Sequence, residues 1–115
     1  MVYSLVVWEI RYLEDAARER DAMPPAERVA LDRAVDKLEA FGPQLPFPHQ
    51  SSVRQGAGLR ELRPRAGRSP WRAFYQRIGD VFVIAAVGPE AQADPRGFER
   101  AVTAALARLE EVNRS

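Results

Sequence analysis

The sequence predicts one α+β domain over residues 1–115, with elements in the order β-α-α-β-β-β-α and an antiparallel sheet packed against helices. Three observations support this fold class. Hydrophobic residues make up 46% of the chain and charged residues 29%, the balance of a folded domain rather than a disordered tail. A chain of 115 residues can bury one core but is too short for two ordinary domains. Helical and strand-like periodicities also alternate along the chain between glycine- and proline-rich breaks.

The first half of the chain contains one expected strand and two expected helices. Residues 2–10 are rich in β-branched and aromatic side chains and predict the first strand. Residues 12–21 predict a short helix that ends before a pair of prolines. Residues 25–41 predict a second helix, because apolar side chains recur there at helical spacing until a Gly-Pro pair ends it. Residues 44–58 have little periodicity and predict a surface loop.

The second half contains three expected strands and a terminal helix. Residues 59–65, 71–78 and 81–87 are strand-like runs joined by short turns, which favours an antiparallel meander. An Asp-Pro pair at 94–95 is typical of a helix start, and apolar side chains follow at helical spacing over residues 98–112. In the sequence, these three strands therefore lie between the second helix and the terminal helix.

The residue inventory excludes several function classes. The chain has no cysteine, so disulfides, thiolate catalysis and cysteine-ligated metal sites are absent. One histidine and scattered carboxylates do not form a convergent ligand set, so we expect neither a metal nor another cofactor. The apolar residues 5–8 are far too few for a membrane span, and no signal-peptide pattern surrounds them. We expect a cytoplasmic protein that does not enter a membrane.

Positive charge is concentrated in one part of the chain, although the formal net charge is only +1. We call residues 51–77 the basic segment, because they contain a single acid, Glu61, and seven arginines. These are Arg54, Arg60, Arg63, Arg65, Arg68, Arg72 and Arg77. The attraction of phosphate for cations dominates nucleic-acid affinity, so a segregated block of this kind predicts a phosphate footprint.

Two of these arginines are expected to face each other across neighbouring strands. If residues 66–69 form the hairpin loop, Arg63 lies opposite Arg72 on the same face of the sheet. Directly opposed like charges cost about 0.2–1 kcal/mol, which a bound anion would offset. Two alternatives stay open: Glu61, on the same face, bridges the arginines, or the prolines at 64 and 70 shift the register by one residue and separate them.

Two further side chains are candidates for RNA chemistry. His49 is a candidate proton carrier, because imidazole titrates near neutral pH. Phe74 is expected on the arginine face and is the better candidate for stacking on a base, while Trp71 and Tyr75 are expected in the core.

The residues at 38–45, 48–49, 58–63 and 71–75 together resemble the RelE/HigB toxin superfamily, in particular its phage-derived HigB-like branch. The quoted motifs are a helix that ends in Phe-Gly-Pro, a Pro-His pair, a Leu-Arg-Glu-Leu-Arg strand and a following Trp-Arg-Ala-Phe-Tyr strand. The resemblance extends from about residue 26 to residue 109.

The resemblance implies a RelE-like fold, a cognate helix-turn-helix antitoxin, and metal-free cleavage of messenger RNA, usually on the ribosome. It implies that Arg63 contacts the scissile phosphate and that Arg72 is the arginine of the next strand. Arg54 and His49 fall where the family's loop often carries basic groups. The chain departs from the pattern after the last strand, where Glu90 occupies a stretch that usually holds lysine or arginine, and in the loop at 51–52, where serines replace lysines.

Two hypotheses follow. In the first, the protein is a toxin with an endoribonuclease activity that acts on messenger RNA at the ribosome. Its catalytic residues are then Arg63, Arg72 and His49, and its RNA-binding residues are Arg54, Arg60, Arg65, Arg68 and Phe74. In the second, the protein is a catalytically weak or inactive member of the same fold that acts as an antitoxin-binding, regulatory or RNA-binding module. The sequence gives no prediction of the oligomeric state.

Overall fold

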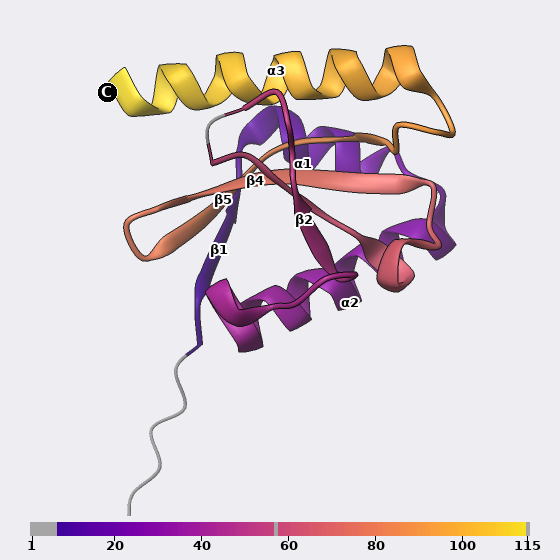
Figure 1. Cartoon of the computed structure of the whole chain (residues 1–115), viewed down its shortest axis with the longest axis horizontal. Coiled ribbons are helices and arrows are strands. Elements are labelled where there is room, and N and C mark those ends of the chain that lie inside the picture. Colours follow the sequence, from indigo (N-terminus) through magenta and orange to yellow (C-terminus); the bar gives the residue numbers. More distant parts are fainter. Residues whose placement is uncertain (1–6, 57, 115) are drawn as a thin grey trace, which may run out of the picture.

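The computed structural model describes residues 7–56 and 58–114 and is shown in Figure 1. This part of the chain forms the helices α1 (Glu14–Asp21), α2 (Pro25–Phe41) and α3 (Pro95–Arg114). It also forms the strands β1 (Glu9–Tyr12), β2 (Gln50–Ser52), β3 (Arg60–Leu62), β4 (Trp71–Ile78) and β5 (Val81–Pro89). Two short 3-10 helices, η1 (Gly42–Gln44) and η2 (Pro64–Gly67), lie in the connections.

The strands form one sheet in the order β1-β5-β4-β3-β2. Strand β1 runs parallel to β5, and all other neighbours are antiparallel. Figure 1 shows α3 along one face of the sheet and α2 across the other. The predicted α+β class, with a largely antiparallel sheet between helices, is therefore confirmed. Within the described ranges, no helix combines the length and the apolar character needed to cross a membrane.

The order of elements differs from the prediction by one strand. The expected loop at 44–58 contains β2, whose Gln-Ser-Ser sequence has little strand propensity. Backbone pairing with β3 places this strand at the sheet edge. The first strand also begins later than expected, at Glu9, and it includes Tyr12. Residues 2–6 of the predicted strand lie outside the described residues.

Helix α2 begins and ends where the sequence predicts. Pro25 occupies the first turn, where its missing amide hydrogen has no cost. Gly42 follows the last turn with a φ of +57°, a conformation that favours glycine. The buried side chains of the helix are Ala30, Leu31, Ala34 and Leu38.

Each face of the sheet carries its own hydrophobic core. The core on the α2 face includes Leu31, Leu38, Leu62, Ala73, Tyr75 and Ile84, with Trp71 packed against it. The core on the α3 face includes Leu59, Phe74, Val83, Val102, Ala105 and Leu109. The prediction that Trp71 and Tyr75 belong to the core is confirmed.

The predicted register between β3 and β4 is also confirmed. Arg60 pairs with Tyr75, Glu61 with Phe74, and Leu62 with Ala73, and continuation of this register by one residue sets position 63 against position 72. The ladder ends at Leu62, because residues 64–67 form η2 instead of extending the strand. The one-residue slip considered for the prolines does not occur.

Candidate functional site

Arg72 is the most deeply buried charge of the basic segment. Its side chain leaves β4 on the α3 face and is only 3% exposed. Nη1 donates to the carbonyl oxygens of Ser69 (2.7 Å) and Trp71 (2.9 Å), and Nη2 donates to that of Gly67 (3.3 Å). The buried Nε has no hydrogen-bond partner among the described residues. The guanidinium is thus fixed in place with one donor unused.

The charges around Arg72 act in opposite directions on its protonation. Burial lowers the pKa of Arg72, and the charge of Arg63 lowers it further. The carboxylates of Glu61 and Glu90 raise the pKa of Arg72 and offset part of this decrease. An anion bound beside Arg72 and Arg63 would act in the same direction as these carboxylates.

Arg63 follows β3 and is held by the preceding loop. Nε donates to the carbonyl oxygen of Pro48 (3.0 Å), and the backbone amide donates to that of His49 (2.9 Å). The guanidinium carbon lies 5.3 Å from the centre of the Phe47 ring, within cation–π range. Nη1 donates to Glu61 Oε1 at 3.0 Å. These contacts direct the guanidinium toward the α3 face.

Glu61 bridges the two arginines, as one of the sequence alternatives proposed. Oε1 lies 3.0 Å from Arg63 Nη1 and 3.8 Å from Arg72 Nε, and it accepts a hydrogen bond from Ser51 Oγ at 2.9 Å. All three of these contacts go to Oε1.

These side chains line one pocket, which we call the α3-side pocket. It has a volume of about 390 Å³ and lies between the end of β3, the segment after β5 and the start of α3. Its charged lining residues are Arg54, Glu61, Arg63, Arg72 and Glu90. Glu90 Oε2 lies 3.9 Å from Arg72 Nη2. Three cations thus face two carboxylates.

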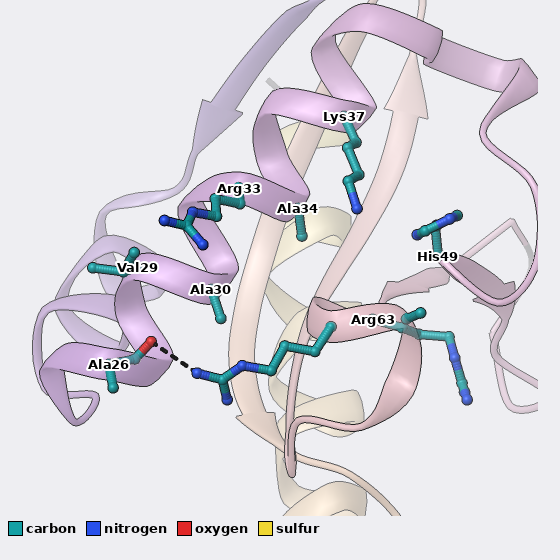
Figure 2. Close-up of a pocket in the computed structure, with 10 residues that line it drawn as sticks. Ala26, Val29, Ala30, Arg33, Ala34, Lys37, His49 and Arg63 are labelled. Carbon is teal, nitrogen blue, oxygen red and sulfur yellow. Dashed lines mark hydrogen bonds between the residues drawn. The ribbon is translucent and has the colours of Figure 1, made fainter.

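A second pocket, the α2-side pocket, lies on the other side of the sheet and has a volume of about 220 Å³. Figure 2 shows the side chains of Lys37 and His49 directed toward the same space, with Arg33 on the far side of Ala34. Arg63 lines this pocket too, but its guanidinium points away from it (Figure 2).

The structure separates the predicted catalytic residues. Arg63 and Arg72 lie on one face and line the α3-side pocket together with Arg54. His49 does not line that pocket: it lines the α2-side pocket, which Arg63 lines too and Arg72 does not. Arg60 also points to the α2 face, where Nε donates to Gln50 Oε1 at 2.6 Å. Alternation along β3 separates Arg60 from Arg63 in this way.

The remaining predicted RNA-binding residues have different environments. Arg65 forms an ion pair with Glu27, and Arg68 is exposed, with Nε donating to the carbonyl oxygen of Arg65 at 3.1 Å. Phe74 lies on the arginine face as predicted, but the prediction that it stacks on a base is wrong. It is fully buried beneath α3, with its ring centre 5.5 Å from that of Phe98.

Several features of these pockets were missed by the sequence reasoning. Phe47 is 69% exposed beside Arg63. The one signal in the sequence that could have found it is an aromatic residue in a proline-rich loop. Arg33 and Lys37 lie four residues apart on α2, a spacing that places them on one side of a helix. In the described ranges, no group of three or more histidine or acidic side chains is arranged to hold a metal ion.

A family model described as "Phage derived protein Gp49-like (DUF891)" matches residues 18–87, more than half of the chain. The chain belongs to the Gp49-like family. The match contains Glu61, Arg63 and Arg72, whereas Glu90 and α3 lie beyond it. The α3-side pocket of this Gp49-like protein is therefore built partly from residues outside the matched region.

Two solved structures share the fold of the Gp49-like protein. The toxin–antitoxin complex RelBE2 from Mycobacterium tuberculosis includes a chain that is 22% identical, with a TM-score of 0.58; the match covers 76% of this chain and 97% of that chain. A mutant of the E. coli toxin RelE in the free state is 19% identical, with a TM-score of 0.61 and coverages of 84% and 96%. A search of curated protein sequences gave no match. The resemblance to the RelE/HigB toxin superfamily is confirmed.

Proposed function

We propose that this Gp49-like protein is the toxin of a type II toxin–antitoxin pair and that it cleaves messenger RNA in the α3-side pocket, without a metal. The whole chain would act as one toxin domain in the cytoplasm, on RNA held by the ribosome. The observation that carries the proposal is the convergence of Arg63 and Arg72 on one carboxylate, Glu61, at the wall of an open pocket.

The two arginines suit the binding of a phosphodiester. A guanidinium presents forked donors that match phosphate oxygens, and it remains charged at any accessible pH. Arg72 lines the pocket and is held by three carbonyl oxygens, so its charge is fixed in place before RNA binds. Preorganised donors of this kind stabilise the negative charge that develops on phosphate oxygens in the transition state.

Glu61 takes the role of proton acceptor that the sequence assigned to His49. A carboxylate beside bound phosphate can accept the proton of the ribose 2′-hydroxyl as its oxygen attacks phosphorus. The new bond joins the 2′-oxygen to phosphorus, and the bond from phosphorus to the 5′-oxygen breaks. The departing oxygen takes a proton from water, and the hydroxide that remains takes the proton held by Glu61. In this proposal the proton goes to Oε2, because Oε1 already accepts hydrogen bonds from Ser51 and Arg63.

We also propose a helix-turn-helix antitoxin as the partner of this chain. The RelBE2 structure is a toxin–antitoxin complex, and its fold is shared by this chain over most of the length of both. Binding of such a partner would keep the toxin inactive until the partner is degraded.

Glu90 favours a second candidate function. Its carboxylate lies 3.9 Å from Arg72 Nη2, where it would repel a phosphate. A protein in which this repulsion prevents cleavage would be an antitoxin-binding or RNA-binding module without enzymatic activity.

Induction of the wild-type protein and its variants in a bacterial host separates the two candidates. We expect the wild type to arrest growth and Arg63→Ala to abolish the arrest, because the phosphate loses one of its two arginine partners. Arg60→Ala is the matched control: it removes an arginine of the same segment from the opposite face and should leave the arrest unchanged. Normal growth with the folded wild type would support the second candidate.

The role of Glu61 is tested with purified protein and ribosome-bound RNA. Glu61→Gln keeps the hydrogen-bond acceptor for Ser51 and Arg63 but cannot take a proton. We expect cleavage to slow by about 100-fold, the usual contribution of a general base. A variant as fast as the wild type would show that Glu61 only positions the arginines.

A further inference from the structure

The α2-side pocket carries uncompensated positive charge. Arg33 and Lys37 lie one helical turn apart, and neither forms an ion pair with any residue in the described ranges. The neighbouring acid Asp32 is paired with Arg20 on another side of α2. Like charges at this spacing repel each other, so a bound anion would relieve the repulsion.

The shape of the pocket lets an anion approach both cations. Its floor is the small side chains Ala30 and Ala34, which leave the α2 backbone close to the surface. Figure 2 shows Arg33 and Lys37 leaving the helix on either side of Ala34, with His49 directed at the same space from the opposite wall. Arg65, another basic side chain of this pocket, is already neutralised by Glu27.

Arg63 connects this pocket to the proposed cleavage site, because it lines both pockets. Its guanidinium lies over the ring of Phe47, which is 69% exposed. Proteins that bind single-stranded RNA combine a basic track for the backbone with exposed aromatic rings on which bases stack. Phe47 and Arg63 provide that combination, and Arg63 connects it to both pockets.

From this arrangement we propose that the α2-side pocket is a second RNA-binding site, which holds a backbone phosphate with Arg33 and Lys37 while an adjacent base stacks on Phe47. The inference rests on the proposed function, since it places the pocket on the path of an RNA strand that leaves the cleavage site. An acidic protein segment is the competing ligand for the same charges. An acidic segment is disfavoured because, unlike RNA, it supplies no base to stack on the exposed ring of Phe47.

The test is a comparison of RNA lengths. We would measure binding of fluorescent 2′-O-methyl RNAs of about 4 and about 12 nucleotides, which cannot be cleaved by 2′-hydroxyl attack. Arg33→Gln/Lys37→Gln should bind the longer RNA about tenfold more weakly and the shorter RNA like the wild type. The slope of log affinity against log salt should fall by about 0.7 for the longer RNA, because one phosphate contact on a single strand contributes about that much.

Arg96→Gln/Arg100→Gln is the matched control. It removes the same charge at the same helical spacing from an exposed part of α3, and neither arginine lines the two pockets. Equal losses in the two double variants would overturn the proposal, since they would reflect net charge alone. Unchanged RNA binding by the α2 variant, with loss of binding to poly-glutamate, would assign the pocket to an acidic protein segment and would also overturn it.

Two further measurements locate the bound RNA. His49 is the only histidine in the chain, so its ring proton signals in NMR report on this pocket alone. They should move when the longer RNA is added and stay fixed with the shorter one. Phe47→Ala should weaken binding of the longer RNA about fivefold, whereas Phe41→Ala, another exposed phenylalanine, should not. Cleavage is not read in any of these assays, so a failure of the proposed function remains distinguishable from a failure of this site.

Discussion

The two pockets use positive charge in different ways. In the α3-side pocket, Arg63 and Arg72 share a carboxylate, and Arg72 is buried and bonded to three backbone carbonyls. In the α2-side pocket, Arg33 and Lys37 face the space with no acid paired to them in the described chain. Both pockets are basic, but only the first has its charged groups fixed and balanced before any ligand arrives.

This difference bears directly on what each pocket can do. Chemistry on a phosphodiester needs a proton acceptor beside rigid cations, which the α3-side pocket supplies in Glu61. Binding of a backbone phosphate needs only accessible positive charge, which the α2-side pocket supplies. The same basic character in the sequence therefore has two proposed uses, catalysis on one face of the sheet and strand binding on the other.

The largest expected effect concerns the core under the α3-side pocket. Phe74→Ala removes a fully buried ring that packs against Phe98 and should lower the free energy of unfolding by about 3 kcal/mol. Phe47→Ala, at an exposed ring, should change it by no more than about 0.5 kcal/mol. Urea unfolding measures both. Equal losses would mean that Phe74 is not the buried partner of α3.

A smaller effect tests whether charge balance limits the α3-side pocket. Glu90→Gln removes a carboxylate 3.9 Å from Arg72 and should tighten binding of an uncleavable RNA by about three- to tenfold at low salt. The control is Glu99→Gln, which removes an exposed acid of α3 that lines neither pocket. If both variants bind equally tightly, Glu90 acts only through the net charge.

The smallest effect concerns Glu27, the ion-pair partner of Arg65 at the α2-side pocket. The hydroxyl of Ser69 and the guanidinium of Arg65 hold the pKa of Glu27 below its usual value. The ionised carboxylate of Glu27 stabilises the fold at any pH above the pKa that it has in the unfolded chain. This stabilisation disappears as the pH falls through the lower pKa of Glu27 in the folded state. Glu27→Gln should cost about 0.5–1 kcal/mol at pH 7 and nothing in strong acid. Thermal melting across pH 2–7 checks this, and a constant difference would contradict it.

Much of this arrangement could be predicted from the sequence. The pairing between β3 and β4 followed from the strand pattern and the turn position, and it correctly placed Arg63 and Arg72 on the same face. Alternation of side chains across a strand makes such predictions possible, because one face is fixed once the register is known.

The errors arose where distant parts of the chain decide the environment. Phe74 could not be recognised as buried, since α3 covers it from more than twenty positions away in the sequence. The side on which His49 lies depends on the path of an irregular loop, which has no periodicity to read. Strand β2 depends on pairing with β3 rather than on its own residues.

The central claim is that the α3-side pocket cleaves RNA by attack of the 2′-hydroxyl. Analysis of the ends of RNA cut by the purified protein in the presence of a metal chelator tests it most directly. Attack by the 2′-hydroxyl should leave a 2′,3′-cyclic phosphate on one fragment and a 5′-hydroxyl on the other, both absent with Arg63→Ala. Fragments that carry a 5′-phosphate and a 3′-hydroxyl, or intact RNA with ribosomes present, would contradict it.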